Sequence, residues 1–194
     1  GMKAKLLAMA PGSVVILHAC CHNPTGADLS DAQWDEVVEA CRERGLVPFL
    51  DMAYQGFADG IDADAVAVRA FSASGLQFFV SSSFSKSFSL YGERVGALSI
   101  ITADKEEAGR VLSQLKRVIR TNYSNPPIHG GAVVAAVLGS SELRQMWEDE
   151  LAGMRDRIRA MRSSLVEKLA AKGVNQDFSF VVKQRGMFSY TGLT

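Results

Sequence analysis

The chain has 194 residues, enough for one sizeable hydrophobic core or for one domain and part of another. Its 21 basic and 21 acidic residues balance, so neither a nucleic acid nor an anionic membrane is indicated as a partner. No apolar run is long enough to span a bilayer, and the 3 cysteines do not form a secreted disulfide framework. We therefore expect a reducing, cytoplasmic setting.

The first part of the chain alternates predicted strands and helices. Apolar and β-branched residues predict a buried strand at 14–20, which is followed by a turn at 22–26. Ser30 and Gln33 have the spacing of a capping box, and the amphipathic helix that they begin ends at Gly45. The same criteria predict a strand at 46–50, a helix at 62–74 and a strand at 76–81.

The second part of the chain contains a longer helical region. The pattern predicts a strand at 96–101, a helix at 105–120, a long amphipathic helix at 142–171 and short strands at 178–182 and 187–190. The apolar stripe of the long helix favours packing within the protein over binding of a partner helix. Alternating strands and helices of these lengths predict an α/β fold with a largely parallel sheet.

Residues suited to chemistry follow the predicted strands. Asn23 follows the first strand, Asp51 ends the second, and Lys86 follows the third. Because the carboxyl ends of parallel strands share one edge of the sheet, we expect these side chains to converge there. Lys86 stands among serines rather than charged residues, so it is a candidate for covalent chemistry with an aldehyde cofactor. The hydroxyls of nearby serines and the guanidinium of Arg94 are suited to a phosphate.

Each of these residues also has an ordinary structural explanation. Taken alone, Asp51 is a turn or cap residue, Asn23 a turn residue and Lys86 a solvated loop lysine. Tyr54 is an amphipathic surface residue, and Arg94 belongs to a surface ion pair. Their order and spacing, taken together, favour the functional interpretation.

A metal site is not expected from the sequence. The cluster of His18, Cys20, Cys21 and His22 matches no usual zinc spacing, and neighbouring residues of a strand point to opposite faces. We expect His18 to be a buried, hydrogen-bonded core residue instead.

Five segments together resemble class I aminotransferases of fold type I, most closely the bacterial aromatic-amino-acid enzymes of the aspartate aminotransferase subgroup. They are His22–Gly26 (HNPTG), Asp51–Phe57 (DMAYQGF), Ser83–Arg94, Arg120–Pro127 and Gln184–Tyr190. The resemblance implies part of a PLP-dependent transferase large domain at 1–140, with a mostly parallel sheet and flanking helices. It also implies a long connecting helix at 141–172 and the start of an α+β small domain at 173–194.

The resemblance implies a role for each matching residue. Lys86 is expected to form a Schiff base with pyridoxal 5′-phosphate (PLP) and to be the catalytic residue. The remaining implied contacts are Asp51 with the ring nitrogen, Asn23 and Tyr54 with the phenolic oxygen, Ser83, Ser85 and Arg94 with the phosphate, and Arg120 and Asn122 with substrate from the other subunit of a homodimer. The implied reaction is transamination of aromatic or dicarboxylic amino acids with 2-oxoglutarate.

The chain matches only the middle of such an enzyme. We expect it to lack a phosphate-binding turn, a residue that stacks on the cofactor ring and the arginine that holds the substrate α-carboxylate. We therefore expect a fragment with little or no transamination by itself. Two alternatives remain open: a catalytically silent folded fragment or association module, and another fold-type I PLP enzyme such as a lyase.

Overall fold

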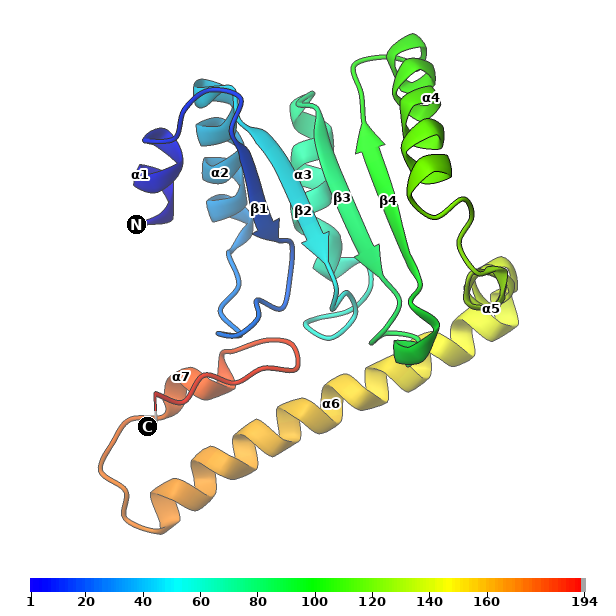
Figure 1. Cartoon of the computed structure of the whole chain (residues 1–194). Helices are drawn as coiled ribbons and strands as arrows, with labels where there is room; N and C mark the ends of the chain where they lie inside the picture. The colour runs from blue at the N-terminus through cyan, green and yellow to red at the C-terminus, as the bar shows by residue number, and fades with distance from the viewer. Residues whose placement is uncertain (193–194) are drawn as a thin grey trace.

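The computed structural model describes residues 1–192 as a four-stranded sheet with helices around it (Figure 1). The strands are β1 (Val14–His18), β2 (Val47–Met52), β3 (Phe78–Ser83) and β4 (Gly96–Ile101), and they lie in that order. β1, β2 and β3 pair in parallel, whereas β4 pairs antiparallel with β3. The predicted α/β fold with a largely parallel sheet is confirmed.

The helices agree with the sequence pattern in the middle of the chain. They are α1 (Met2–Leu7), α2 (Asp31–Arg44), α3 (Val66–Ser74), α4 (Lys105–Asn122), α5 (Ile128–Gly139), α6 (Ser141–Ala171) and α7 (Ser179–Val182), with 3₁₀ turns η1 (Ala63–Ala65) and η2 (Tyr91–Glu93). The capping box is present, since Ser30 and Gln33 exchange both hydrogen bonds and Gly45 ends α2 in the left-handed conformation. Helices α1 and α5 were not predicted.

The main hydrophobic core lies between the sheet and helices α2 and α3. Along β2 the side chains alternate between buried and half-buried, as a strand with one covered face requires. Leu50, Phe71 and Phe78 are completely buried in this layer, with Trp34 edge-on to Phe71. The opposite face of the sheet is open, and Ile16 of β1 is 68% exposed there.

Three predictions about individual strands are wrong. The first strand ends at His18 rather than at residue 20, because the chain turns away and Cys21 takes a positive φ of 53°. The strands expected at 178–182 and 187–190 do not form. Residues Ser179–Val182 form α7 instead, beginning where the carboxylate of Asp177 accepts a hydrogen bond from the Ser179 N–H.

Helix α6 crosses beneath the carboxyl ends of β1, β2 and β3 (Figure 1). Leu151 of α6 is buried in a second hydrophobic cluster with Cys21, Tyr54 and Phe57, and Phe188 packs against this cluster. The loop at Gly56 approaches α6 so closely that a Cβ atom there would lie 2.3 Å from Leu151 Cδ2. Within residues 1–192 we find no helix that combines the length and apolar character needed to cross a membrane.

Candidate active site

Asp51 occupies a row of polar residues that crosses three strands. His18, Asp51 and Ser81 are register partners on β1, β2 and β3. Since Leu50 and Met52 are buried in the core beside α2 and α3, the alternation of side chains directs Asp51 to the other face. Ser81 Oγ donates to Asp51 Oδ1 over 3.1 Å, which orients the half-buried carboxylate.

Tyr54, Asn23 and Lys86 lie together, and the Asn23 N–H donates to His18 of the polar row. Asn23 Nδ2 donates to Tyr54 Oη over 3.5 Å, and Lys86 Nζ lies 4.7 Å from the centre of the Tyr54 ring. Throughout residues 1–192, no carboxylate lies within ion-pair distance of Lys86 Nζ. The lysine amine therefore faces an aromatic ring and has no acidic partner. An amine without an ion pair is suited to act as a nucleophile.

The serines and Arg94 flank the segment that carries Lys86. Ser83 ends β3, and its Oγ accepts a hydrogen bond from the N–H of the buried Ser85 over 3.3 Å. Arg94 is exposed after the 3₁₀ turn η2, and its Nη1 donates to the Tyr91 carbonyl over 3.0 Å. The remaining donors of its guanidinium have no partner within residues 1–192 and are free to meet an anion.

Arg120 and Asn122 lie apart from these groups. Both are exposed in the last turn of α4, where Arg120 Nη1 donates to Ser124 Oγ. In the described part of the chain, neither makes a hydrogen bond, ion pair or ring contact with Lys86 or Tyr54. The structure therefore brings together Asn23, Tyr54 and Lys86, but not this pair.

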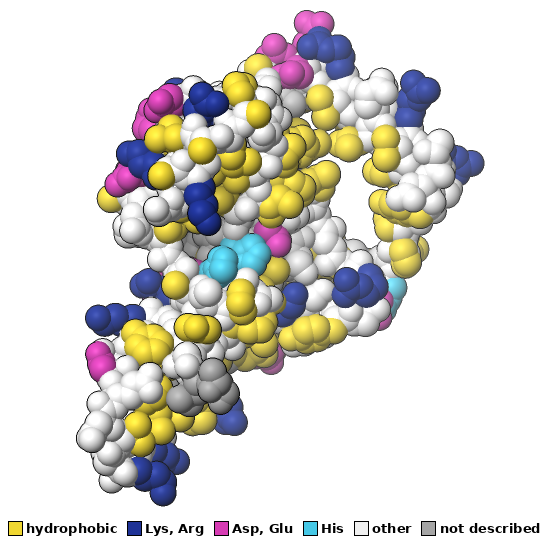
Figure 2. Space-filling view, turned by 60° about the vertical axis from the view of Figure 1, so that its left-hand side comes forward, with side chains coloured by type: hydrophobic (Ala, Val, Ile, Leu, Met, Phe, Trp, Pro, Cys, Tyr) yellow, Lys and Arg dark blue, Asp and Glu magenta, His cyan; other side chains and the backbone are white. Residues whose placement is uncertain are grey.

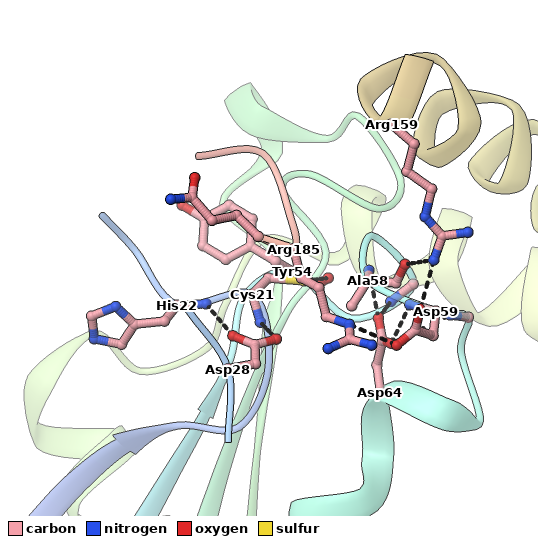
Figure 3. Close-up of polar contacts among 12 residues, drawn as sticks. Cys21, His22, Asp28, Tyr54, Ala58, Asp59, Asp64, Arg159 and Arg185 are labelled. Atoms are coloured by element: carbon pink, nitrogen blue, oxygen red, sulfur yellow. Dashed lines mark hydrogen bonds and ion pairs between the residues drawn. The ribbon is translucent and has the colours of Figure 1, made fainter. Parts of the chain in front are cut away.

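Asp28 holds the turn that carries Asn23, a role that the sequence analysis missed. Its carboxylate accepts hydrogen bonds from the N–H groups of Cys21 and His22 over 2.7 and 2.8 Å (Figure 3). His18 is hydrogen-bonded as expected, since its Nδ1 accepts from the Asn23 N–H over 3.1 Å. It is half-buried rather than a core residue, because its neighbour Leu17 points into the main core and His18 lies on the other face of β1.

His18 at the end of β1 and His22 in the turn influence each other. Their ring centres lie 4.8 Å apart, and histidine side chains gather near the middle of the face in Figure 2, beside an acidic side chain. Burial and the neighbouring His18 lower the pKa of His22 below its usual value of 6.5, although Asp28 opposes this shift. His22 is therefore held mainly neutral near pH 7.

Asp64 holds the loop that follows Tyr54. Its buried carboxylate accepts four backbone hydrogen bonds, from the N–H groups of Gly56, Ala58, Asp59 and Gly60, at 2.7, 3.0, 2.8 and 3.3 Å (Figure 3). No local pattern distinguishes Asp64 from its neighbour Asp62, so only the folded loop reveals this role.

Cys20 and Cys21 do not point to opposite faces, contrary to the sequence-based expectation. Because the strand has already ended, their sulfurs and a carboxylate oxygen of Asp64 lie within 4.8 Å of one another. The Asp64 oxygens already accept four N–H groups, and the Cys21 thiol donates to the Tyr54 carbonyl over 3.4 Å. A hydrogen bond with Cys21 and burial raise the pKa of Cys20. The protonated Cys20 thiol, beside a carboxylate that already accepts four hydrogen bonds, is a poor metal ligand.

The whole chain matches one known protein family. The sequence model of the family described as aminotransferase class I and II matches residues 1–194. The chain belongs to this family. It is 65% identical over its full length to an aspartate aminotransferase of Pseudomonas aeruginosa, of which it covers 49%. It is 54% identical over 98% of its length to an aromatic-amino-acid aminotransferase of Escherichia coli, of which it covers 48%.

Solved structures of this aminotransferase family have the same fold. A Burkholderia pseudomallei aromatic-amino-acid aminotransferase, covalently bound to pyridoxal phosphate, superposes with a TM-score of 0.98 at 71% identity. A Psychrobacter aromatic amino acid aminotransferase, cocrystallised with aspartic acid, superposes with a TM-score of 0.97 at 48% identity. In each case all of this chain matches 48% of the other chain, so it spans about half the length of its relatives.

Proposed function

We propose that the chain provides the lysine-bearing part of a PLP site for transamination of aspartate or aromatic amino acids with a 2-oxo acid. The convergence of Lys86 and Asn23 on Tyr54 at the carboxyl edge of the sheet is the observation that carries this proposal. The names of the relatives support the two substrate classes. Function within a homodimer is part of the proposal.

The donor groups fit the chemically distinct parts of PLP. The Asp51 carboxylate, oriented by Ser81, would hold the protonated ring nitrogen. The Tyr54 hydroxyl and Asn23 amide, already within 3.5 Å of each other, would both donate to one phenolic oxygen. Lys86 has no acidic partner within residues 1–192 and would take the aldehyde carbon.

The phosphate and substrate sites would be assembled from exposed groups. Ser83 and Ser85 supply hydroxyls in the segment before Lys86, and the free side of the Arg94 guanidinium supplies charge. Arg120 and Asn122 are exposed on α4, which suits a role toward the active site of a partner subunit. There Arg120 would bind the side-chain carboxylate of a dicarboxylic substrate.

The residues of this chain then have defined tasks in the reaction. When bound, PLP supplies an aldehyde that accepts the amino group and a ring that withdraws electrons from the reacting carbon. The free Lys86 amine would take the proton from the substrate α-carbon as a general base and would later return a proton as a general acid. The Tyr54 ring beside Nζ would keep this amine in place during the transfer.

Labelling tests the proposal directly. The chain is incubated with PLP, reduced with borohydride and digested, and the phosphopyridoxyl group is located by mass spectrometry. We expect labelling of Lys86, loss of that label in Lys86→Ala, and its retention in a control, Lys116→Ala, which alters an exposed lysine of α4. Labelling of several surface lysines to the same extent as Lys86 would refute the proposal.

The open face of the sheet favours a second candidate, an association module without its own chemistry. Val14 and Ile16 of β1 are 56% and 68% exposed, and Ile128 of α5 is 85% exposed. Apolar exposure of this kind is typical of surfaces that other polypeptide covers. Sedimentation that shows concentration-dependent association, together with no labelling of Lys86, would favour this candidate.

A further inference from the structure

Helix α6 carries a row of three arginines that donate hydrogen bonds to backbone carbonyls of other segments. Arg155, Arg159 and Arg162 follow one another at steps of four and three residues, so they share one face of the helix. Arg155 Nη1 donates to the Gly56 carbonyl over 2.9 Å, and Arg159 Nη2 donates to the Ala58 carbonyl over 2.6 Å. These two residues hold the loop that follows Tyr54.

Arg162 gathers the C-terminal segment around its guanidinium. Nε donates to Ser189 Oγ over 2.9 Å, and Nη1 donates to the Gln184 carbonyl over 2.8 Å. Nη2 donates to the carbonyls of Gly186 and Phe188, both over 2.6 Å. Arg162 is only 5% exposed.

The buried guanidinium of Arg162 donates its hydrogen bonds to neutral acceptors. Within residues 1–192, no carboxylate forms an ion pair with this side chain. Removing a guanidinium from water is costly unless its N–H groups find acceptors. The four acceptors from residues 184–189 meet this need, so the shape of the segment and the burial of Arg162 depend on each other.

The segment held by Arg162 reaches the residues of the candidate site. The Phe188 ring meets the Tyr54 ring edge-on, with centres 5.6 Å apart. Gly186, with φ of 78°, lies so close that a Cβ atom there would be 2.4 Å from Cys21 Cβ. The Arg185 N–H donates to the Gly26 carbonyl over 2.7 Å, at the end of the turn that carries Asn23.

Asp59 links the two held segments. Arg159 Nη2 and Arg185 Nε converge on its carboxylate, at 2.6 and 2.7 Å from Oδ1 and Oδ2 (Figure 3). The loop after Tyr54 and the C-terminal segment are thereby joined to each other as well as to α6. Movement of residues 184–189 would therefore disturb both the Phe188 contact with Tyr54 and the loop that follows Tyr54.

We propose that Arg162 is a positioning residue: by folding residues 184–189 against Tyr54, Cys21 and Gly26, it fixes the Tyr54 phenol and the Asn23 turn in their binding arrangement. The folding of residues 184–189 by Arg162 does not require a cofactor. The effect on PLP binding by Tyr54 and Asn23 rests on the proposed function.

Thiol accessibility tests the structural part. Cys20 and Cys21 are buried beside the segment, whereas Cys41 is buried in the main core on α2 and reports unfolding of the whole chain. We expect Arg162→Met to speed maleimide labelling of Cys21 by about tenfold or more, since its donors to the segment are lost. Labelling of Cys41 and the far-ultraviolet circular dichroism should not change. Arg157→Met, an exposed arginine of the same helix, is the matched control.

Two further variants keep the test decisive if Arg162→Met does not fold. Arg162→Lys preserves the charge with fewer donors and should give a smaller acceleration. Gly186→Ala retains Arg162 but places a methyl group against Cys21, and it should also free the segment. The proposal would be overturned if Cys21 stayed as protected from maleimide as Cys41 in the folded variants. It would also be overturned if all three cysteines became equally exposed in every variant.

The PLP-loaded chain gives a separate measurement. Donors to the phenolic oxygen of PLP favour its anionic form, so a displaced Tyr54 should raise the pH midpoint of the cofactor's absorbance change in Arg162→Lys. An unchanged midpoint would overturn the link to the cofactor. Absence of Lys86 labelling in the unaltered chain would refute the proposed function and leave the thiol result interpretable.

Discussion

Replacing Asp64 by asparagine should destabilise the chain strongly, because this one carboxylate organises the loop after Tyr54. It accepts four backbone N–H groups while only 4% exposed. An asparagine offers one acceptor oxygen, so two of the four bonds are lost and an N–H₂ group faces N–H donors. Hydrogen bonds to a charged group contribute about 1.5–3 kcal/mol each, so we expect a loss of about 3 kcal/mol or more.

Urea unfolding followed by circular dichroism measures this loss. Asp62→Asn is the matched control, since Asp62 is exposed and its side chain makes no capping hydrogen bond, and it should change stability by no more than about 0.5 kcal/mol. Limited proteolysis should also cleave the loop at 55–60 sooner in Asp64→Asn. A destabilisation as small as that of the control would refute the reasoning that the four bonds act through the charge.

Three other outcomes are expected. Ser30→Ala should cost about 1 kcal/mol in urea unfolding through loss of the capping box, and no change would contradict the cap's role. Leu151→Ala should cost about 2–5 kcal/mol, because the side chain is 1% exposed and joins α6 to the site, whereas a loss below about 1 kcal/mol would indicate a loosely packed cluster. His22 should titrate below 6.5 by NMR, because burial and His18 lower its pKa. The contribution of His22 to stability is then complete above pH 6.5 and decreases as the pH falls below that value. The melting temperature of His22→Gln should therefore depend less on pH below 6.5 than that of the unaltered chain, and an equal dependence would contradict this.

Much of the site could be predicted because its residues follow local signals. Asn23, Asp51 and Lys86 each come after or at the end of an apolar strand, and parallel pairing brings such positions to one edge. The contacts of Asn23 and Lys86 with Tyr54 agree with that expectation. The roles of these residues toward PLP, and the division of the chain at residues 140 and 172, stay predictions.

Other parts of the site depend on how the loops fold around single polar side chains. Asp28, Asp64 and Arg162 look like ordinary surface residues in the sequence. Asp28 and Asp64 are each bound by backbone N–H groups of the nearby loop, whereas the acceptors of Arg162 come from the distant C-terminal segment. Periodicity cannot identify such residues, since a hydrogen bond to a loop requires the loop to be in place first.

The sequence by itself determined the alternation of strands and helices, the cap of α2 at Ser30 and the order of the residues around Lys86, because periodicity, caps and motifs are local properties. Only the tertiary structure decided that Cys20 and Cys21 converge and that residues Ser179–Val182 form a helix. The same is true of Arg162, which holds the C-terminal segment against Tyr54. A strand needs a partner and a buried charge needs acceptors, and both come from distant parts of the chain.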